Sequence, residues 1–371
     1  MICDTAMFAV LAPLLPDYVD ELGLTTSEAA VMTAMFSFGV IAGALPGGYV
    51  ASRVGGKRTV LVAAMILAGA CVCFALARSL ILLDAARLLQ GIAGGALWTG
   101  ALTWLAAAAP PDGRATALGW LIGVATLGSL VGPPLGALGA ATSVEVVFLG
   151  VALLVAALCL AMQRLPEPGG SPAGGSPARL LQRASLPRTA RAIWTMLLPM
   201  CGFGVVLALG PLRLDAFGAG AAAIAAVYLI AGGAEMLTPP LAGRAVDRTG
   251  IAPLLRVARV AGALSFVLLA AAREPLLIGT LLVVAVAVAS SFSVPAGVRL
   301  EEAAERAGVG TGHGFALLSL SFAGGQLLGA ALTALLASDE TDGLPFLVVA
   351  AGFVITLALS SATALRPVPG R

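Results

Sequence analysis

The chain has 371 residues, of which 59% are hydrophobic and 11% are charged, and its formal net charge is +2. Soluble proteins carry about 25% charged residues, so most of this chain must lie in lipid. The small net charge gives no support for a nucleic-acid-binding protein. Five cysteines lie within apolar runs and His313 is the only histidine, so the sequence offers no set of metal ligands.

Twelve apolar segments are long enough to cross a bilayer, which takes about 20 residues each. The predicted spans are 2–22, 29–51, 59–77, 80–106, 115–138, 144–163, 193–213, 219–245, 252–272, 275–298, 311–337 and 343–365. The predicted fold is therefore an all-α membrane protein. The first segment carries Asp4 and no basic region precedes it, which is typical of a retained span and leaves open a truncated start.

The segment 164–191 is rich in Pro, Gly, Ser and Arg, which is typical of a flexible linker. The predicted division is a six-helix bundle over 1–163, a linker over 164–192 and a second six-helix bundle over 193–371. Most basic residues fall on one side of the membrane, and by the positive-inside rule this side is cytoplasmic, with both termini and the linker. The loop residues expected on the opposite side are Arg78, Arg213 and Arg273.

Two features recur in both halves of the sequence. The loop after the second span, GGYVASRVGGKR, resembles AGRAVDRTG after the eighth, with Arg53 aligned to Arg248. Gly128 and Gly132 of the fifth span recur in the eleventh as Gly325 and Gly329. Parallel repeats of six spans indicate a transporter made of two pseudo-symmetric bundles, with the substrate site between them.

At these residues the chain resembles the major facilitator superfamily, over essentially its whole length. The first loop signature comprises Gly48, Ser52, Arg53, Gly55, Lys57 and Arg58. Its second-half counterpart comprises Gly243, Asp247, Arg248 and Gly250. The fourth-span motif comprises Arg87, Gln90, Gly91 and Gly94. Ser52 stands where the family has an acid that helps to hold one conformation closed; a serine can cap a helix but carries no charge.

The fifth span resembles the motif that accompanies proton-coupled export in this family. Its residues are Gly119, Gly128, Gly132, Pro133 and Gly136. Gly128, Gly132 and Gly136 share one helical face, and Gly119 lies nearly opposite. We expect other helices to approach this glycine face closely and the span to act as a hinge near Pro133. The resemblance implies twelve spans in two six-helix bundles and favours the drug:proton antiporter group.

Polar residues within the fourth span are candidates for function, because ionisable groups are costly in lipid. Arg87, Gln90 and Trp98 share one face, which we expect to line a water-filled central cavity. Arg87 would tune a nearby carboxylate or hold an anionic group. The alternative is a structural pair with Asp84, three residues earlier. Trp98 is a candidate for contact with the substrate.

Asp4 in the first span and Glu235 in the eighth are candidate proton or substrate-coupling sites. The alternatives are a solvated interfacial carboxylate for Asp4 and an acid hydrogen-bonded to a neighbouring helix for Glu235. Pro239 and Pro240 follow Glu235, and they predict an irregular stretch that lines a cavity.

The sequence thus predicts a secondary active transporter of the bacterial plasma membrane, functional as a monomer, that exports small organic molecules in exchange for protons by alternating access. A symporter or facilitator that imports a small metabolite remains the alternative. No nucleophile, metal site or acid–base set indicates an enzyme. No cofactor and no nucleic-acid partner are expected. The loop glycines do not form an ATP-binding sequence, so the proton gradient is the expected source of energy.

Overall fold

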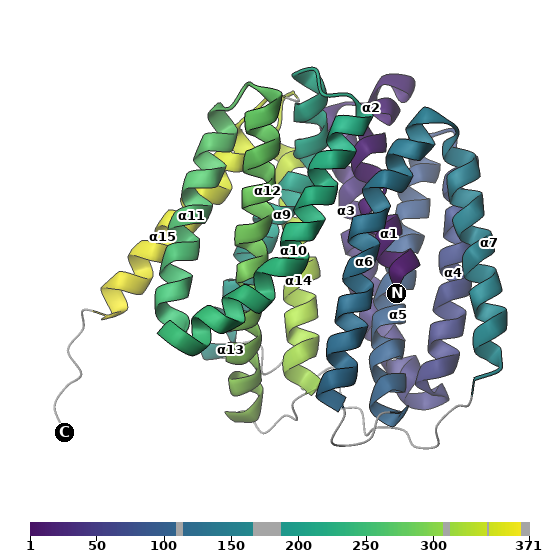
Figure 1. Cartoon of the computed structure of the whole chain (residues 1–371), viewed down its shortest axis with the longest axis horizontal. Helices are drawn as coiled ribbons and strands as arrows, with labels where there is room; N and C mark the ends of the chain where they lie inside the picture. The colour runs from purple at the N-terminus through teal and green to yellow at the C-terminus, as the bar shows by residue number, and fades with distance from the viewer. Residues whose placement is uncertain (109–113, 166–186, 307–311, 340, 365–371) are drawn as a thin grey trace.

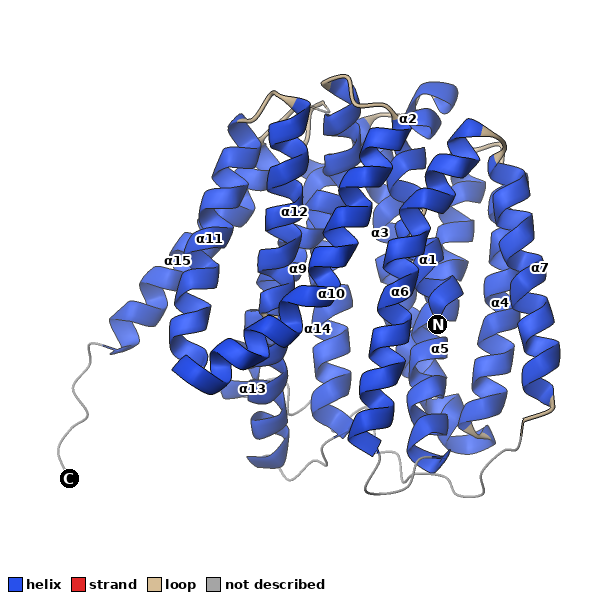
Figure 2. Cartoon of the chain, viewed as in Figure 1, coloured by secondary structure: helices blue, strands red, loops and turns tan. Residues whose placement is uncertain are grey.

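The computed structural model describes residues 1–108, 114–165, 187–306, 312–339 and 341–364, and every regular element within these ranges is a helix (Figure 2). Before the predicted linker lie α1 (Ile2–Ala9), α2 (Leu11–Leu22), α3 (Thr26–Val54), α4 (Gly56–Leu76), α5 (Leu80–Ala108), α6 (Arg114–Ala141) and α7 (Val144–Gln163). After it lie α9 (Pro187–Ala216), α10 (Ala221–Thr249), α11 (Ile251–Ala271), α12 (Pro275–Ser291), α13 (Ser293–Arg306), α14 (Gly312–Leu336) and α15 (Leu344–Ala364).

Ten helices of the described chain are long and apolar enough to cross a membrane, and there are eleven if the bent pair α1 and α2 counts as one span. The last predicted span, 343–365, corresponds to α15, in which Leu344–Ser360 forms a shorter apolar helix. The seventh span begins earlier than predicted, because α9 starts at Pro187 within the expected linker.

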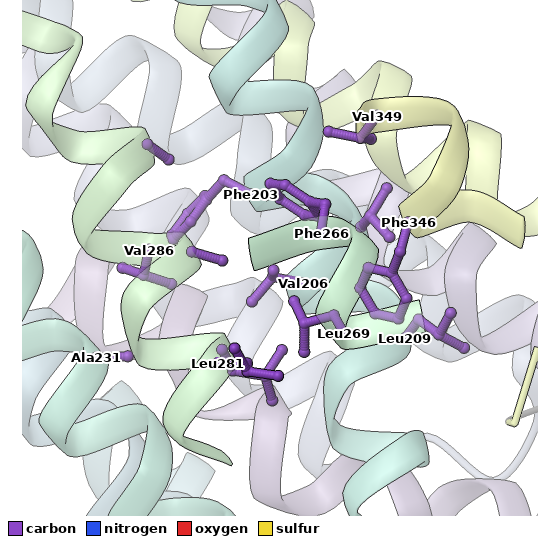
Figure 3. Close-up of a cluster of buried hydrophobic side chains, with 14 of the residues drawn as sticks. Phe203, Val206, Leu209, Ala231, Phe266, Leu269, Leu281, Val286, Phe346 and Val349 are labelled. Atoms are coloured by element: carbon purple, nitrogen blue, oxygen red, sulfur yellow. The ribbon is translucent and has the colours of Figure 1, made fainter. Parts of the chain in front are cut away.

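Two groups of helices lie side by side, with α1–α7 in one and α9–α15 in the other (Figure 1). Each group has its own hydrophobic cluster. We call the cluster centred in α1–α7 the first cluster and the one centred in α9–α15 the second cluster. The second cluster contains side chains from α9, α10, α11, α12 and α15, including Phe203, Phe266 and Phe346 (Figure 3). The predicted bundle boundaries themselves stay predictions.

We call the side of the molecule that carries Gly55 and Gly250 the linker end, and the side that carries Gly23 and Gly218 the far end. Gly55 and Gly250 end α3 and α10 with positive φ angles of 96° and 85°. Non-glycine residues rarely adopt this backbone conformation, so glycine is required at both turns. The repeated loop signature therefore corresponds to a repeated turn.

The two groups of helices meet along α3 and α14, along α6 and α10, and where α2 contacts α9 and α10. At the third contact the two hydrophobic clusters exchange residues: Ala12 of α2 belongs to the second cluster and Leu212 of α9 to the first. Helix α2 and the end of α9 both lie at the far end of the molecule. The far-end halves of the first and seventh spans therefore contribute to the contact between the two groups of helices.

Candidate functional site

Asp4 is a buried carboxylate between α1 and α5. Its side chain is 3% exposed, and Oδ1 has no hydrogen-bond partner among the described residues. This oxygen lies against Gly94 of α5, where an added Cβ atom would come within 2.6 Å of it. Gly94 therefore provides the space for the carboxylate, which excludes the solvated interfacial position considered from the sequence.

Arg87 lies two turns before Gly94 on α5 and is buried, with 1% exposure. Its Nη1 donates to the Met7 carbonyl of α1 at 2.9 Å and to Gln90 Oε1 at 3.0 Å. The guanidinium also lies 4.8 Å from the ring centroid of Phe36 on α3. Arg87 on α5 thus contacts both α1 and α3 through its guanidinium group. Met7, the residue it holds on α1, lies one turn from Asp4.

The pair between Arg87 and Asp84 that the sequence left open is not among the ion pairs of the described residues. Asp84 is half-buried instead, and its Oδ1 has no hydrogen-bond partner within the described chain. Their spacing of three residues permits a pair, but Arg87 Nη1 donates to the Met7 carbonyl and the Gln90 amide oxygen instead, and its Nε has no hydrogen-bond partner within the described chain.

The face of α5 that was expected to line a water-filled cavity is packed between helices. Gln90 is 0% exposed, and Gly91 lies so close to α3 that an added Cβ would clash with the Phe36 carbonyl. Glycines at 91 and 94 let α3 and α1 approach, which closes this face. Trp98 is half-buried, and no contact links it to Arg87 within the described chain.

Glu235 lies midway along α10 and is partly exposed. One turn earlier, Gly232 approaches the Ser129 carbonyl of α6, with a distance of 3.1 Å from its ideal Cβ position. Glu235 therefore lies near the contact between the two groups of helices. The predicted irregular stretch at Pro239–Pro240 is wrong, because α10 stays helical to Thr249, although it turns away from α6 near that end (Figure 1).

The glycine face of the fifth span is the surface on which the first span packs. Added Cβ atoms at Gly128, Gly132 and Gly136 would clash with the backbone of α1 and α2. The repeat has the same role in the second group, where Gly325 and Gly329 approach the backbone of α9. Gly119 lies within α6, and its surroundings are outside the described side chains.

A bend occurs in the first span rather than in the fifth. α1 and α2 meet at 42° around Val10, whereas α6 continues as one helix through Pro133. Pro13 has no N–H to donate to the Ala9 carbonyl, which weakens the first span at this point. In α6, Pro133 deprives the Ser129 carbonyl of its helical donor, and this carbonyl faces Gly232 of α10.

The loop signature has a local role in this conformation. Lys57 Nζ donates to the Gln163 carbonyl at 2.9 Å and to the Leu165 carbonyl, so it caps the end of α7. Arg53 lies 5.1 Å from the Tyr49 ring of its own helix, and Ser52 Oγ donates to the Tyr49 carbonyl at 2.7 Å.

The remaining signature residues lie at the surface of the linker end. Arg58, Asp247 and Arg248 all have exposed side chains. Gly48 and Gly243 have open space around them, so neither accommodates the close approach of a neighbouring helix. On α3 that role belongs to Gly43 and Gly47, whose added Cβ atoms would clash with α5.

Arg213 and Gln326 are among the buried polar residues that the sequence analysis did not identify. Arg213, interpreted as a loop residue, is 1% exposed and donates to the carbonyls of Ala270, Ala272 and Thr341. Gln326 of α14 is 4% exposed and accepts a hydrogen bond from Ser37 of α3. A polar residue within an apolar run was the signal for Gln326.

Within the described chain, no group of three or more His, Cys, Asp or Glu side chains could hold a metal ion. A family model described as Major Facilitator Superfamily matches residues 1–312. The chain belongs to the major facilitator superfamily. Members of this family are secondary transporters rather than enzymes, and the chain is a multi-pass integral membrane protein.

Similar major facilitator proteins include the chloramphenicol resistance protein of Streptomyces lividans, 29% identical over 248 residues that cover 64% of this chain and 62% of that protein. The gallate transporter of Pseudomonas putida is 32% identical over 155 residues, which cover 39% of this chain and 34% of that protein. The chain thus matches less than two thirds of the length of either relative. The crystal structure of the nucleoside transporter NupG has the same fold, with a TM-score of 0.79, 15% identity and coverage of 99% and 97%.

Proposed function

We propose that this chain exports small organic molecules in exchange for protons, by alternating access between two bundles over 1–163 and 193–371. The Asp4 carboxylate carries the proposal, because it is 3% exposed and its Oδ1 lacks a hydrogen-bond partner within the described chain. An ionised carboxylate in such a place is costly, so a group of this kind suits the uptake and release of a proton as its exposure changes.

The Arg87 contacts support a link between this proton and the packing of the first span. Arg87 holds the Met7 carbonyl of α1, and Asp4 rests on Gly94 one turn away. A movement of α1 on α5 therefore alters the surroundings of both groups together. Glu235 is the second candidate, because it lies near the contact between α6 and α10, where relative movement of the bundles would change its exposure.

The contacts between the bundles support a conformation that is closed at the far end. Ser27 Oγ of α3 donates to the Ala334 carbonyl of α14 at 2.7 Å, close to the far-end termini of both helices. Beside it, small buried residues from α3, α9 and α14 form a separate cluster. By the positive-inside rule the linker end is cytoplasmic, so this conformation is closed on the side of a bacterial plasma membrane that is away from the cytoplasm.

The names of two relatives supply the candidate substrates. One of them is named for chloramphenicol resistance, which makes chloramphenicol the first compound to test. Another is named a gallate transporter, and this observation keeps import of a small metabolite as the second candidate function. The fifth-span residues that resemble the exporter motif favour export.

Everted membrane vesicles from a strain without its own exporters test the proposal. With an acidic lumen, wild-type vesicles should accumulate chloramphenicol, and collapse of the pH gradient should release it. Asp4→Asn and Glu235→Gln should lose the dependence on the gradient while the protein remains folded in the membrane. Glu274→Gln removes an exposed acid at the start of α12 and serves as the control. Accumulation that ignores the gradient contradicts proton coupling.

A further inference from the structure

Gln326 is the buried polar residue through which the second group of helices reaches the first. Its main-chain carbonyl lies against Gly204 of α9, and its side chain crosses to α3, where Ser37 Oγ donates to Oε1 at 3.4 Å. Gln326 is 4% exposed and Ser37 is 3% exposed. The other amide atom, Nε2, has no hydrogen-bond partner among the described residues.

The other buried polar residues of α14 satisfy their hydrogen bonds locally. Ser321 Oγ donates to the Leu317 carbonyl at 2.6 Å, and Thr333 Oγ1 donates to the Gly329 carbonyl at 3.1 Å. Leaving a buried donor without an acceptor costs about 1–3 kcal/mol, so such groups in native proteins call for an explanation. Packing alone does not explain why a glutamine occupies position 326, because an apolar side chain would fill the same space without an unpaired donor.

The surroundings of Gln326 are aromatic and uncharged. Phe322 lies one turn earlier on α14, and its ring centroid is 6.4 Å from that of Phe203, the residue before Gly204 on α9. The helix α14 carries no Asp, Glu, Lys or Arg. Gln326 lies ten residues from the far-end terminus of α14, which is about 15 Å along a helix and so near the middle of the membrane.

Neighbouring residues of α3 connect Gln326 with Arg87. Phe36 carries the Arg87 guanidinium on its ring, while Ser37 contacts Gln326 in the other group of helices. The Phe36 ring also lies 5.0 Å from that of Phe8 on α1. A ligand held by Gln326 would therefore act next to the helix that supports the buried cation.

We propose that Gln326 binds the transported molecule, and that this molecule is an uncharged aromatic compound whose hydrogen-bond acceptor pairs with the Nε2 donor of the Gln326 amide. An amide offers two donors and one acceptor, and only the acceptor is engaged here. The bond from Ser37 to Oε1 is long for an O–H···O contact, so it leaves the Nε2 donors open to a ligand. The two phenyl rings supply the apolar contact that an aromatic ligand needs.

This inference rests on the proposed transport function, since it names a contact for the transported molecule. A ligand without a hydrogen-bond acceptor would leave the buried amide unpaired and would bind much more weakly. A site of this kind therefore discriminates strongly between ligands. Chloramphenicol is an uncharged aromatic compound with hydrogen-bond acceptors. We therefore expect it to bind with a lower Kd than the gallate anion.

Equilibrium binding of radiolabelled chloramphenicol to the purified full chain in detergent tests the inference. Gln326→Met keeps the length of the side chain and removes the amide, and it should raise the Kd about tenfold, which corresponds to about 1.4 kcal/mol. Gln326→Leu should behave in the same way. Thr333→Val is the matched control, because Thr333 is a buried polar residue of the same helix that bonds to its own backbone, and its Kd should stay within about twofold of wild type.

Ser37→Ala provides a second readout. It removes the bond to Gln326 Oε1 and leaves the Nε2 donor in place, so the Kd should stay within about threefold of wild type, even if the Gln326 variants fail to fold. The inference is overturned if wild type does not bind chloramphenicol, if Gln326→Met binds as wild type does, if Thr333→Val loses as much, or if Ser37→Ala weakens binding about tenfold.

Transport measured in parallel separates this inference from proton coupling. If Gln326→Met weakens binding but wild-type transport ignores the pH gradient, the ligand contact stands and proton exchange fails. If the gradient drives transport and Gln326→Met transports with an unchanged KM, the ligand contact fails and proton exchange stands.

Discussion

The carboxylate oxygen Oδ1 of Asp4 lies against Gly94, 2.6 Å from the position that a Cβ atom on Gly94 would occupy. A fourth-span glycine thus provides the space for a first-span acid. The relationship joins two residues that the sequence marked for different reasons, one as a buried charge and the other as part of a family motif.

Gly94→Ala should displace this carboxylate without separating the helices. The atom nearest to the new methyl group is the end of a side chain rather than backbone, so Asp4 can rotate away. We expect gradient-driven transport to fall about tenfold while the melting temperature in detergent changes little, since overpacking that a side chain can absorb costs least. Gly123→Ala is the control, because open space surrounds Gly123; an equal loss in both variants would refute a role for the Asp4 position.

Gly132→Ala should destabilise the contact between the fifth and first spans. The added methyl group would lie 2.6 Å from the Ala6 carbonyl and 2.7 Å from the Ala9 Cβ, so α1 must shift. Overpacking of this kind costs about 1–3 kcal/mol, and thermal unfolding in detergent should show it. Gly139→Ala on the same helix meets its nearest atom at 3.6 Å and should melt as wild type does. Equal melting temperatures for both variants would contradict the packing role.

Ser27→Ala should favour opening at the far end. It removes the hydrogen bond from α3 to the Ala334 carbonyl, which is worth about 1 kcal/mol, so the population open at this end should rise about fivefold. The measurement is maleimide labelling of Ala30→Cys, a buried position of the contact between α3 and α14, after replacement of the five native cysteines. Ser321→Ala, whose partner is in its own helix, should leave labelling unchanged. Unchanged labelling in Ser27→Ala would show that this bond does not hold the end closed.

Arg213→Ala should destabilise the far end of the second group of helices by about 3–5 kcal/mol, because it leaves three carbonyl groups of Ala270, Ala272 and Thr341 without their donor. Thermal unfolding should reveal the loss, and Arg273→Ala, an exposed residue, should have little effect. A stability equal to wild type would mean that water replaces the guanidinium at no cost.

Hydrophobic length and repeated glycines could be predicted from the sequence, and the partners of the buried polar groups could not. Apolar runs locate spans because a bilayer requires them, and Gly128 and Gly132 recur with Gly325 and Gly329 because each pair receives the first helix of its group. Arg87 pairs with the Met7 carbonyl, and every residue carries such a carbonyl, so residue type gave no signal.

The position of the bend shows a second limit of the sequence. Prolines occur in both the first and the fifth spans, and their effect depends on the helices packed around them. The bend falls at Val10, near Pro13, while α6 passes through Pro133 and Pro134 as one helix. Replacement of Pro133 remains a test of whether the fifth span moves during transport.

The most direct test of proton exchange is the direction of the gradient that drives uptake into proteoliposomes. Purified chain is reconstituted, and chloramphenicol uptake is compared with an acidic lumen, an acidic exterior and no gradient. Exchange predicts uptake driven by an acidic lumen, together with loss of this effect in Asp4→Asn. Uptake driven by an acidic exterior, or equal uptake under all three conditions, would contradict it.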